Sequence, residues 1–427
     1  MMRLIIVCLC LQVSNAIADS TSALPDPLSL QQVMQMADQP DYFTLINAQS
    51  KIVKSQSELE LAESSLGFNA QLELQAAYVE TSDIAFDQSN NDSSAILRLT
   101  KPLYDFGNTD RKIQAANIEQ QAWRTNVPYV IAQRKIDIAR YFFEVILSDL
   151  KYAWDNEILA ITYVRHEAEK DRYELSQISD LELLESENRY MDVLHIRNVS
   201  EIAQRHSRAT LAEVLNRPAQ LPSNLVLPKL SFLQAELTEY PLLMEKILLT
   251  NPQVKLAEKQ YKAAEQRLLA ENSQLNPLLS AELKISEYTR TTSRDDMRAS
   301  INLTMPLYES SSIKSRMSMA RAALLEQRAK LLSIKSQVRK QALSLWQNVA
   351  LLKTRHQQLQ TTQELRELNL DKNRALYEME VATDLGNSMV AISEIRYLRA
   401  KNEYALALLW MQLRLLAGET DVMNATL

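Results

Sequence analysis

The stretch LTKPLYD at positions 99–105 returns as LTMPLYE at positions 303–309, and the two copies lie 204 residues apart (303 − 99 = 204). The same offset separates Tyr173-Glu174 from Tyr377-Glu378 and Asp180-Leu181 from Asp384-Leu385. Loops tolerate insertions far better than packed elements do, so a spacing that holds this far indicates elements of fixed length. The sequence therefore predicts two copies of one rigid unit.

The N-terminus has the pattern of a secretory signal peptide. Arg3 precedes an apolar run at 4–13, and Ala16-Ile17-Ala18 forms an A-x-A cleavage site, which predicts a signal peptide at 1–18 and a mature chain from Asp19. Ser14-Asn15-Ala16 is a second possible cleavage site. Because both cysteines, at positions 8 and 10, lie inside the run, we expect a mature chain without thiols or disulfides.

The composition is typical of long helices. Four Gly and 12 Pro in 427 residues are few turn-forming residues, and good helix formers fill most of the chain. A net charge of −6 without a basic block argues against nucleic acid as a partner. After the predicted signal, no apolar run approaches the ~18 residues that indicate a membrane-spanning helix. If the protein crosses a membrane, we expect it to do so with strands.

One segment in each half changes its hydrophobic period from 3.6 to 2, which predicts β-hairpins at 69–101 and 279–305. Along 69–78 the even positions are apolar and the odd positions polar up to Gln75, and Leu279 to Ile285 alternate with polar residues in the same way. Strands of roughly ten residues have the length that a tilted strand needs to cross a bilayer. A soluble two-stranded ribbon is the alternative, but an isolated hairpin is marginally stable in water.

Long helical hairpins are predicted at 105–215 and 309–417, with turns near 176–179 and 381–383. Each hairpin completes one structural repeat, the first at 19–216 and the second at 241–427, and a Pro-punctuated connector at 217–240 joins the two. A helix that continues from Pro306 to Tyr377 would be about 105 Å long, more than a compact domain of this size needs.

The predicted fold class is mainly α with a small β part. Four strands per chain cannot close a barrel, and open strand edges are not stable in lipid, so closure requires other copies of the chain. Three chains would supply twelve strands, a number within the range of outer-membrane barrels. We therefore expect a homotrimer with a 12-stranded transmembrane β-barrel, continued by coiled-coil-like helical hairpins that form an α-barrel.

These residues resemble the TolC-like outer-membrane efflux proteins, which are exit ducts of tripartite drug pumps and type I secretion systems. The resemblance covers nearly the whole mature chain and rests on Asn251-Pro252, on both Pro-Leu-Tyr segments, and on the RYEL and DLELL segments at 172–175 and 180–184. It implies a trimer in outer-membrane lipid and a helical tunnel through the periplasm. It also implies docking on a periplasmic adaptor and an inner-membrane transporter.

The resemblance also implies a gate where the helical hairpins end. Its acidic positions fall here on Gly386 and Met389, which are not acidic, and the 204-residue offset puts Glu182 and Glu185 at the equivalent sites in the first repeat. Asp180 and Asp384 are candidates both for gate acids and for helix N-caps. The candidates for adaptor docking at the hairpin tips are Arg172, Tyr173, Ser176, Tyr377 and Glu380; Ser176 and Glu380 stand where family tips tend to carry Gly.

No catalytic, cofactor or metal site is predicted. The four histidines, at positions 166, 195, 206 and 356, have no metal-ligand spacing, and neither G-x-S-x-G nor a Gly-rich phosphate loop occurs. The alternative to an exit duct is a periplasmic or surface coiled-coil scaffold that transports nothing. The alternation of polar and apolar residues along the predicted strands argues against it, since a scaffold has no need of an outward apolar face.

Overall fold

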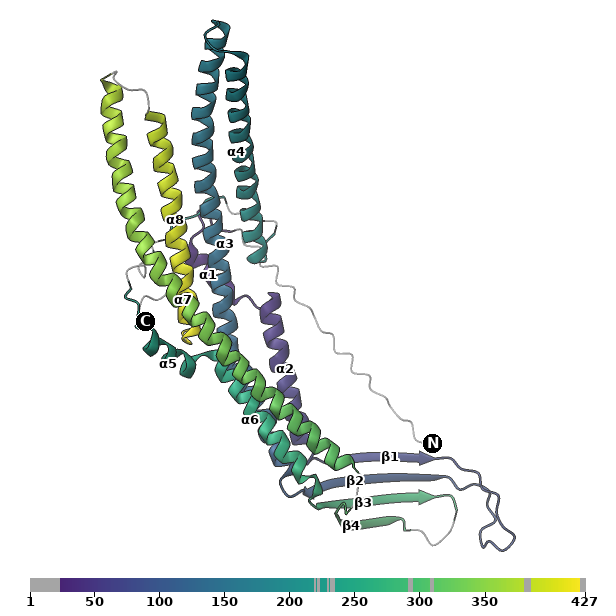
Figure 1. Ribbon diagram of the computed structural model, residues 1–427. Coiled ribbons are helices and arrows are strands. Elements are labelled where there is room, and N and C mark those ends of the chain that lie inside the picture. The colour runs from purple at the N-terminus through teal and green to yellow at the C-terminus, as the bar shows by residue number, and fades with distance from the viewer. Residues whose placement is uncertain are drawn as a thin grey trace.

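The computed structural model describes residues 24–218, 220, 223–228, 230, 235–290, 295–307, 311–379 and 385–422. The predicted signal peptide and cleavage site, the predicted turn at 381–383, and the candidates Glu380 and Asp384 lie outside the described residues. Figure 1 shows an elongated molecule with two helical hairpins at one end and a small sheet at the other.

Two helices of equal length dominate the chain. α3 (Asn108–Glu174) and α7 (Ser312–Glu378) each have 67 residues, and both their starts and their ends differ by the 204-residue offset (312 − 108 and 378 − 174). At ~1.5 Å per residue each is about 100 Å long. α4 (Asp180–Val214) returns along α3, and α8 (Leu385–Leu416) returns along α7. The long helical hairpins expected from the sequence are therefore confirmed.

Shorter helices complete the half of the molecule next to the sheet. α2 (Phe43–Ser64) packs on α3, and α6 (Pro252–Asn272) packs on both α3 and α7. The side chain of Asn251 caps α6 by accepting the N–H groups of Gln253 and Val254, each at 3.0 Å, and donates to the Leu416 carbonyl at 2.8 Å. The Asn-Pro pair found in the sequence therefore both starts α6 and ties it to the end of α8.

Smaller elements gather around the middle of the long helices. They are α1 (Leu30–Gln35), the 3-10 turn Met36–Asp38 and α5 (Tyr240–Thr250), whereas a second 3-10 turn, Ser273–Leu275, joins α6 to β3 beside the sheet. The core lies at this level, where Phe142, Phe143, Trp410 and Met411 are buried and the ring of Phe143 stacks on Tyr404 with centroids 4.5 Å apart. None of the helices within the described ranges is both long enough and apolar enough to pass through a membrane.

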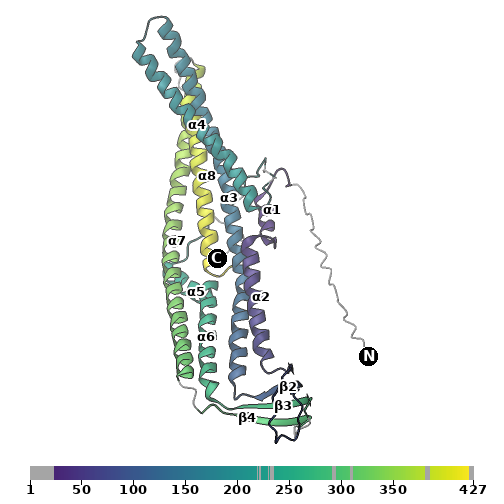
Figure 2. The same cartoon turned by 90° about the vertical axis from the view of Figure 1, so that its right-hand side faces the viewer.

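The helices form an open layer with two free sides (Figure 2). α3 lies in its middle and contacts α2, α4, α6 and α8, while α7 contacts α5, α6 and α8. α2 and α4 therefore lie along one side of the layer and α7 along the other. Each side carries exposed apolar residues seven positions apart: Ile46 and Val53 on α2, Leu184 and Met191 on α4, and Leu325 and Leu332 on α7.

The strands form one antiparallel sheet in the order β1-β2-β3-β4. β1 (Asn69–Gln75) pairs with β2 (Ser94–Tyr104), and β3 (Leu278–Tyr288) pairs with β4 (Met297–Thr304). β2 also pairs with β3, which joins the two hairpins, so β1 and β4 are the edges. β1 has 7 residues and is shorter than the roughly ten predicted; beyond it Tyr78 still makes one isolated pairing with Asn91.

α3 ends in a Schellman motif at Ser176. The Gln177 N–H donates to the Arg172 carbonyl at 2.9 Å and the Ser176 N–H to the Tyr173 carbonyl at 2.8 Å. Closing this motif holds Ser176 at φ 58°, in the left-handed region that favours glycine. Ser176, at the position where the resemblance expects Gly, therefore adopts a left-handed conformation in which its side chain is strained.

We expect Ser176→Gly to stabilise this turn by about 1 kcal/mol, because a side chain is costly in the left-handed region. Amide hydrogen exchange at 174–178 should slow by roughly fivefold, the factor that about 1 kcal/mol corresponds to at 25 °C. Ser176→Val is the matched control and should speed the same exchange, since a β-branched residue fits this conformation worst. Equal rates in all three proteins would contradict the strain argument.

Candidate functional site

The first helical tip is organised by a capping box at the start of α4. The N-cap is Ser179, whose hydroxyl accepts the Glu182 N–H at 3.3 Å, while the Glu182 carboxylate accepts the Ser179 N–H at 2.7 Å. The N-cap role considered for Asp180 was therefore wrong by one residue, since Asp180 is the first residue of the helix. The S-x-x-E spacing at 179–182 was the sequence signal for this cap.

The carboxylate of Glu182 is bound within its own chain. Hydrogen bonds from the backbone N–H and the hydroxyl of Ser179 lower the pKa of the Glu182 carboxyl, and the charge of Arg172 contributes in the same direction. Glu182 and Glu185 are both exposed on the returning helix. Their predicted position at the axis of a pore stays a prediction.

Two other candidates at this tip contact each other. The hydroxyl of Tyr173 donates a hydrogen bond to the Asp180 carboxylate, and this bond together with the charge of Asp180 raises the pKa of Tyr173. The structure therefore brings Tyr173, proposed for adaptor docking, and Asp180, proposed for the gate, into one surface across the turn, where Arg172 and Ser176 are also exposed.

At the second tip, Gly386 lies against the first repeat. A Cβ at this position would stand 3.0 Å from Cδ1 of Ile161 on α3, so the glycine allows α8 and α3 to approach closely. Beside it, the guanidinium of Arg165 donates to Asn387 at 2.7 Å. Nothing in the local sequence indicated this contact, because it joins residues 225 positions apart (386 − 161 = 225).

Met389 and Tyr377 are exposed at the same tip. Met389 has 51% of its surface accessible and follows Gly386 by three residues on α8, whereas Tyr377 lies in the last turn of α7. The roles predicted for Met389 in a constriction and for Tyr377 in docking are not tested by these positions.

The sheet has one polar face and one face that is apolar along its middle, with Lys101 and Glu287 near the two ends of the apolar face. Paired residues in an antiparallel sheet share a face, so the register aligns the apolar positions across all four strands. Those of the apolar face are Ala70, Leu72, Leu74, Ala95, Leu97, Leu99, Leu279, Ala281, Leu283, Ile285, Met297, Ala299, Ile301 and Leu303. The alternation read from the sequence is thereby extended into a continuous surface.

Aromatic residues border this sheet at both ends. Phe68, Tyr104 and Phe106 lie exposed where the strands meet the helices, and Tyr78 and Phe86 lie exposed in the loop between β1 and β2. The ammonium of Lys101 lies 4.5 Å from the centroid of the Phe68 ring. Aromatic rings at both ends of a lipid-facing band are typical of membrane β-structure. The sequence analysis missed this feature, although the rings flank the predicted strands.

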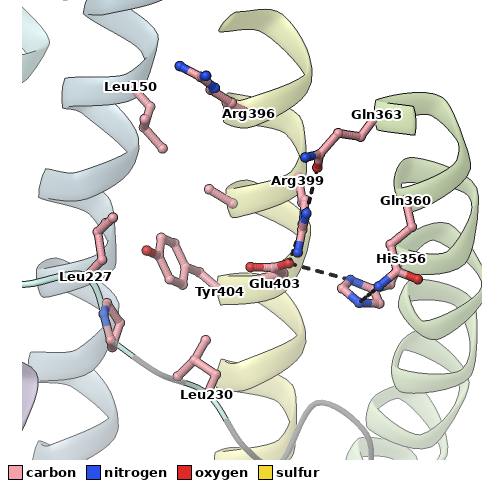
Figure 3. Close-up of a pocket in the computed structure, with 12 residues that line it drawn as sticks. Leu150, Leu227, Leu230, His356, Gln360, Gln363, Arg396, Arg399, Glu403 and Tyr404 are labelled. Atoms are coloured by element: carbon pink, nitrogen blue, oxygen red, sulfur yellow. Dashed lines mark hydrogen bonds and ion pairs between the residues drawn. The ribbon is translucent and has the colours of Figure 1, made fainter. Parts of the chain in front are cut away.

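A lateral cavity of 710 Å³ lies at mid-height between α3, α7, α8 and the connector (Figure 3). On one wall the Glu403 carboxylate accepts Arg399 Nε at 2.8 Å and lies 3.9 Å from His356 Nδ1. Arg399 also donates to Gln363 at 2.6 Å. Burial, with a smaller contribution from Glu403, raises the pKa of Tyr404 to about 12. Arg399 therefore balances the cavity's one carboxylate.

No set of three His, Cys, Asp or Glu side chains in the described part of the chain is arranged to hold a metal ion. Of the histidines, His166 stacks on Tyr190 with centroids 5.6 Å apart and shares a 3.1 Å hydrogen bond with Ser186. Both contacts are packing contacts between α3 and α4.

Several solved structures of outer-membrane proteins have this arrangement of helices and sheet. The outer membrane protein VceC of Vibrio cholerae is 16% identical with a TM-score of 0.69, covering 91% of this chain and 96% of its own. The CmeC outer membrane channel of Campylobacter jejuni is 12% identical with a TM-score of 0.71, covering 92% and 86%. The open state of the MtrE outer membrane channel of Neisseria gonorrhoeae is 14% identical with a TM-score of 0.67, covering 92% and 88%.

The chain has the fold of these outer-membrane channels. The fold expected from the resemblance to TolC-like proteins is thus confirmed over nearly the whole chain. No protein-family model and no curated protein matches the sequence. At identities this low the likeness concerns the fold alone, so the function has to be argued from the surfaces described above.

The capping box predicts that Glu182 stabilises the start of α4 by accepting hydrogen bonds, and two substitutions separate this role from the effect of its negative charge. Ser179→Ala should weaken the first turn of α4 by about 1 kcal/mol and speed amide exchange at 180–183 roughly fivefold. Glu182→Gln is the matched control, because a carboxamide oxygen accepts the same two hydrogen bonds, and it should leave exchange nearly unchanged.

The lowered pKa of Glu182 sets the sign of the pH dependence. A carboxyl whose pKa is lower in the folded state stabilises the fold above its unfolded pKa, and this contribution is lost as pH falls through the folded value. In wild type, protection at 180–183 corrected for intrinsic exchange should therefore fall on acidification, whereas the Glu182→Gln protein should keep it. If protection falls with pH in the same way in wild type and in the Glu182→Gln protein, the cap is not the cause of the pH dependence.

Proposed function

We propose that this protein is an outer-membrane channel that assembles as a homotrimer and serves as the exit duct of a tripartite efflux pump or type I secretion system. The observation that carries the proposal is the sheet, which presents one continuous apolar face and two unpaired edges at the end of helical hairpins about 100 Å long. It has the shape of one third of a lipid-facing wall joined to one third of a tube.

The unpaired strand edges support a closed assembly. β1 and β4 have pairing partners on one side only, and backbone N–H and C=O groups left unbonded in hydrocarbon cost several kcal/mol each. Pairing β1 of one copy with β4 of the next satisfies both edges. Three chains then give the twelve strands of a barrel, with the apolar face outward and the polar face toward the lumen.

The free sides of the helical layer support the same assembly. α2 and α4 lie on the side of β1, and α7 lies on the side of β4, so the neighbour that pairs the strands also meets the helices. Each of these helices carries one pair of exposed apolar residues seven positions apart, a spacing that coiled coils use in packing. The same symmetry rotation that pairs β1 with β4 of a neighbouring copy thus also covers the free sides of the helical layer.

Periplasmic adaptors and inner-membrane transporters are the partners we infer for the opposite end. The helical tips lie about 100 Å from the sheet, a span suited to crossing an envelope. Their exposed polar surface, with Arg172, Tyr173, Ser176 and Tyr377, is the candidate docking surface. In the proposed trimer Glu182, Glu185 and Met389 are candidates for the constriction.

Placing a charge on each face of β1 tests the channel proposal. Leu72→Lys introduces a charge on the apolar face, where a cationic side chain near the bilayer midplane costs about 2–4 kcal/mol, and should strongly reduce trimer recovered from outer membranes. Gln71→Lys, the neighbouring residue on the polar face, should insert normally. Reconstituted wild type should conduct in planar bilayers, and normal insertion of both variants with no conductance would refute the proposal.

A cysteine at Met389 tests whether the second tip closes on the symmetry axis. Met is flexible and apolar, which suits a contact that forms around an axis and separates again. Oxidation of Met389→Cys should link subunits and reduce the conductance of the reconstituted channel. Asn387→Cys is the control, since two residues along a helix turn the side chain by about 200°. Complete labelling of position 389 by an external thiol reagent without any inter-subunit link would exclude the axial contact.

A further inference from the structure

The polar face of the sheet carries a row of basic side chains. Arg98 on β2 is paired with Lys284 on β3, and Lys284 is paired with Arg298 on β4. Gln71 on β1 completes the row beside Arg98. Since paired residues share a face, three cationic side chains on three neighbouring strands project to the same side with no acid between them.

Acids pair with the two outer bases of this row and leave Lys284 at its centre without an acidic partner among the described residues. Glu282 approaches Arg98 at 3.9 Å, and Asp295 pairs with Arg298 from the end of the β3–β4 loop. Lys284, between these pairs, makes no hydrogen bond or ion pair with any described residue, and Nε of Arg98 is buried without a hydrogen-bond partner. Two further acids lie in the next row toward the loop: Glu73 on β1, opposite Ile96, and Asp296, whose carbonyl accepts the Ser286 N–H at 2.8 Å just before β4.

Directly opposed like charges destabilise a sheet, so an unpaired Lys284 between Arg98 and Arg298 calls for a reason. Such a row would be costly on a sheet face buried in a protein core. On a sheet face that lines a water-filled lumen it is tolerated, and its electrostatic field reaches the solutes there. Rings of Arg and Lys are the device by which pores favour anions.

We infer that these residues form a ring near mid-height of the barrel that attracts anionic solutes. The inference rests on the proposed channel function: three basic residues in each of three chains give nine around one level of the lumen. Arg98 lies four residues from Ser94, where β2 leaves the loop, and therefore about 13 Å from that end of the strand at ~3.3 Å per residue. The ring thus stands close to the middle of the strands, one residue to the loop side of the midpoint of β2.

The ring gives the exit a charge preference that is independent of the helical tips. Its field extends about one Debye length from the wall, which is about 10 Å at 0.1 M salt and about 3 Å at 1 M. Anionic solutes entering the barrel are concentrated at the level of the ring, and a polyanion added from outside should bind there and obstruct the current.

Side-specific block of the reconstituted channel tests the ring. A short polyglutamate peptide added to the side of the β1–β2 loop should reduce wild-type current at 0.1 M KCl, and the block should weaken at 1 M KCl. Replacing Arg98, Lys284 and Arg298 together by Gln should raise the half-blocking concentration on the order of tenfold, since each exposed charge contributes modestly. Lys284→Gln alone should give part of this loss.

Two matched variants separate the ring from general charge and from misfolding. Lys101→Gln removes the same charge from β2 on the opposite face and should leave the block unchanged. Gln71→Lys adds a fourth basic residue to the row and should strengthen the block. If every variant conducts and the peptide blocks all of them at the same half-blocking concentration, the ring is overturned.

Binding measured without current keeps this test separate from the channel proposal. Fluorescein-labelled polyglutamate should bind detergent-solubilised wild type, and the binding should decrease in the triple Gln variant. Binding with this dependence in a protein that never conducts would reject the channel and retain the ring. Conductance that the peptide leaves unaffected in wild type would reject the ring and retain the channel.

Discussion

The pairing of β2 with β3 is the contact on which the rest of the architecture depends. It joins two hairpins that come from distant parts of the chain into one sheet and leaves β1 and β4 as its edges. Without it each hairpin would be an isolated two-stranded ribbon, which is marginally stable in water. With it, the two helical hairpins that continue from the strands are held side by side, and the free sides of the sheet and of the helical layer coincide.

The equal length of α3 and α7 follows from that pairing. Both helices start where the sheet ends and both must reach the same far level, so an insertion in either one would displace its tip relative to the other. Their starts and ends keep the same 204-residue offset although their sequences have diverged. The glycine at 386 fits this picture, because the close approach of α8 to Ile161 sets where the second tip lies relative to the first.

Much of this fold could be predicted from the sequence, because the signals are local. The change of hydrophobic period marks the strands, Asn251-Pro252 marks the start of α6, and the S-x-x-E spacing at 179–182 was available for the cap even though Asp180 was considered instead. The contacts between β2 and β3 and between Gly386 and Ile161 could not be predicted, since each joins residues far apart in the chain and leaves no periodic pattern. The roles of the candidate site residues were the hardest to predict, because the role of a side chain at the proposed pore depends on the other copies of the chain.

A single chain nevertheless shows which charged side chains already have partners and which do not. Glu182 at the helical tip accepts two hydrogen bonds from Ser179, so part of its charge serves to hold the first turn of α4. Lys284 on the sheet has no such partner among the described residues, and it stands between two basic neighbours whose partners approach from outside the row. A charge bound to its own backbone offers little to a passing solute, whereas an unbound one keeps its field. In the proposed channel the wall of the sheet, rather than the acidic tip, is therefore the part best equipped to discriminate among solutes by charge.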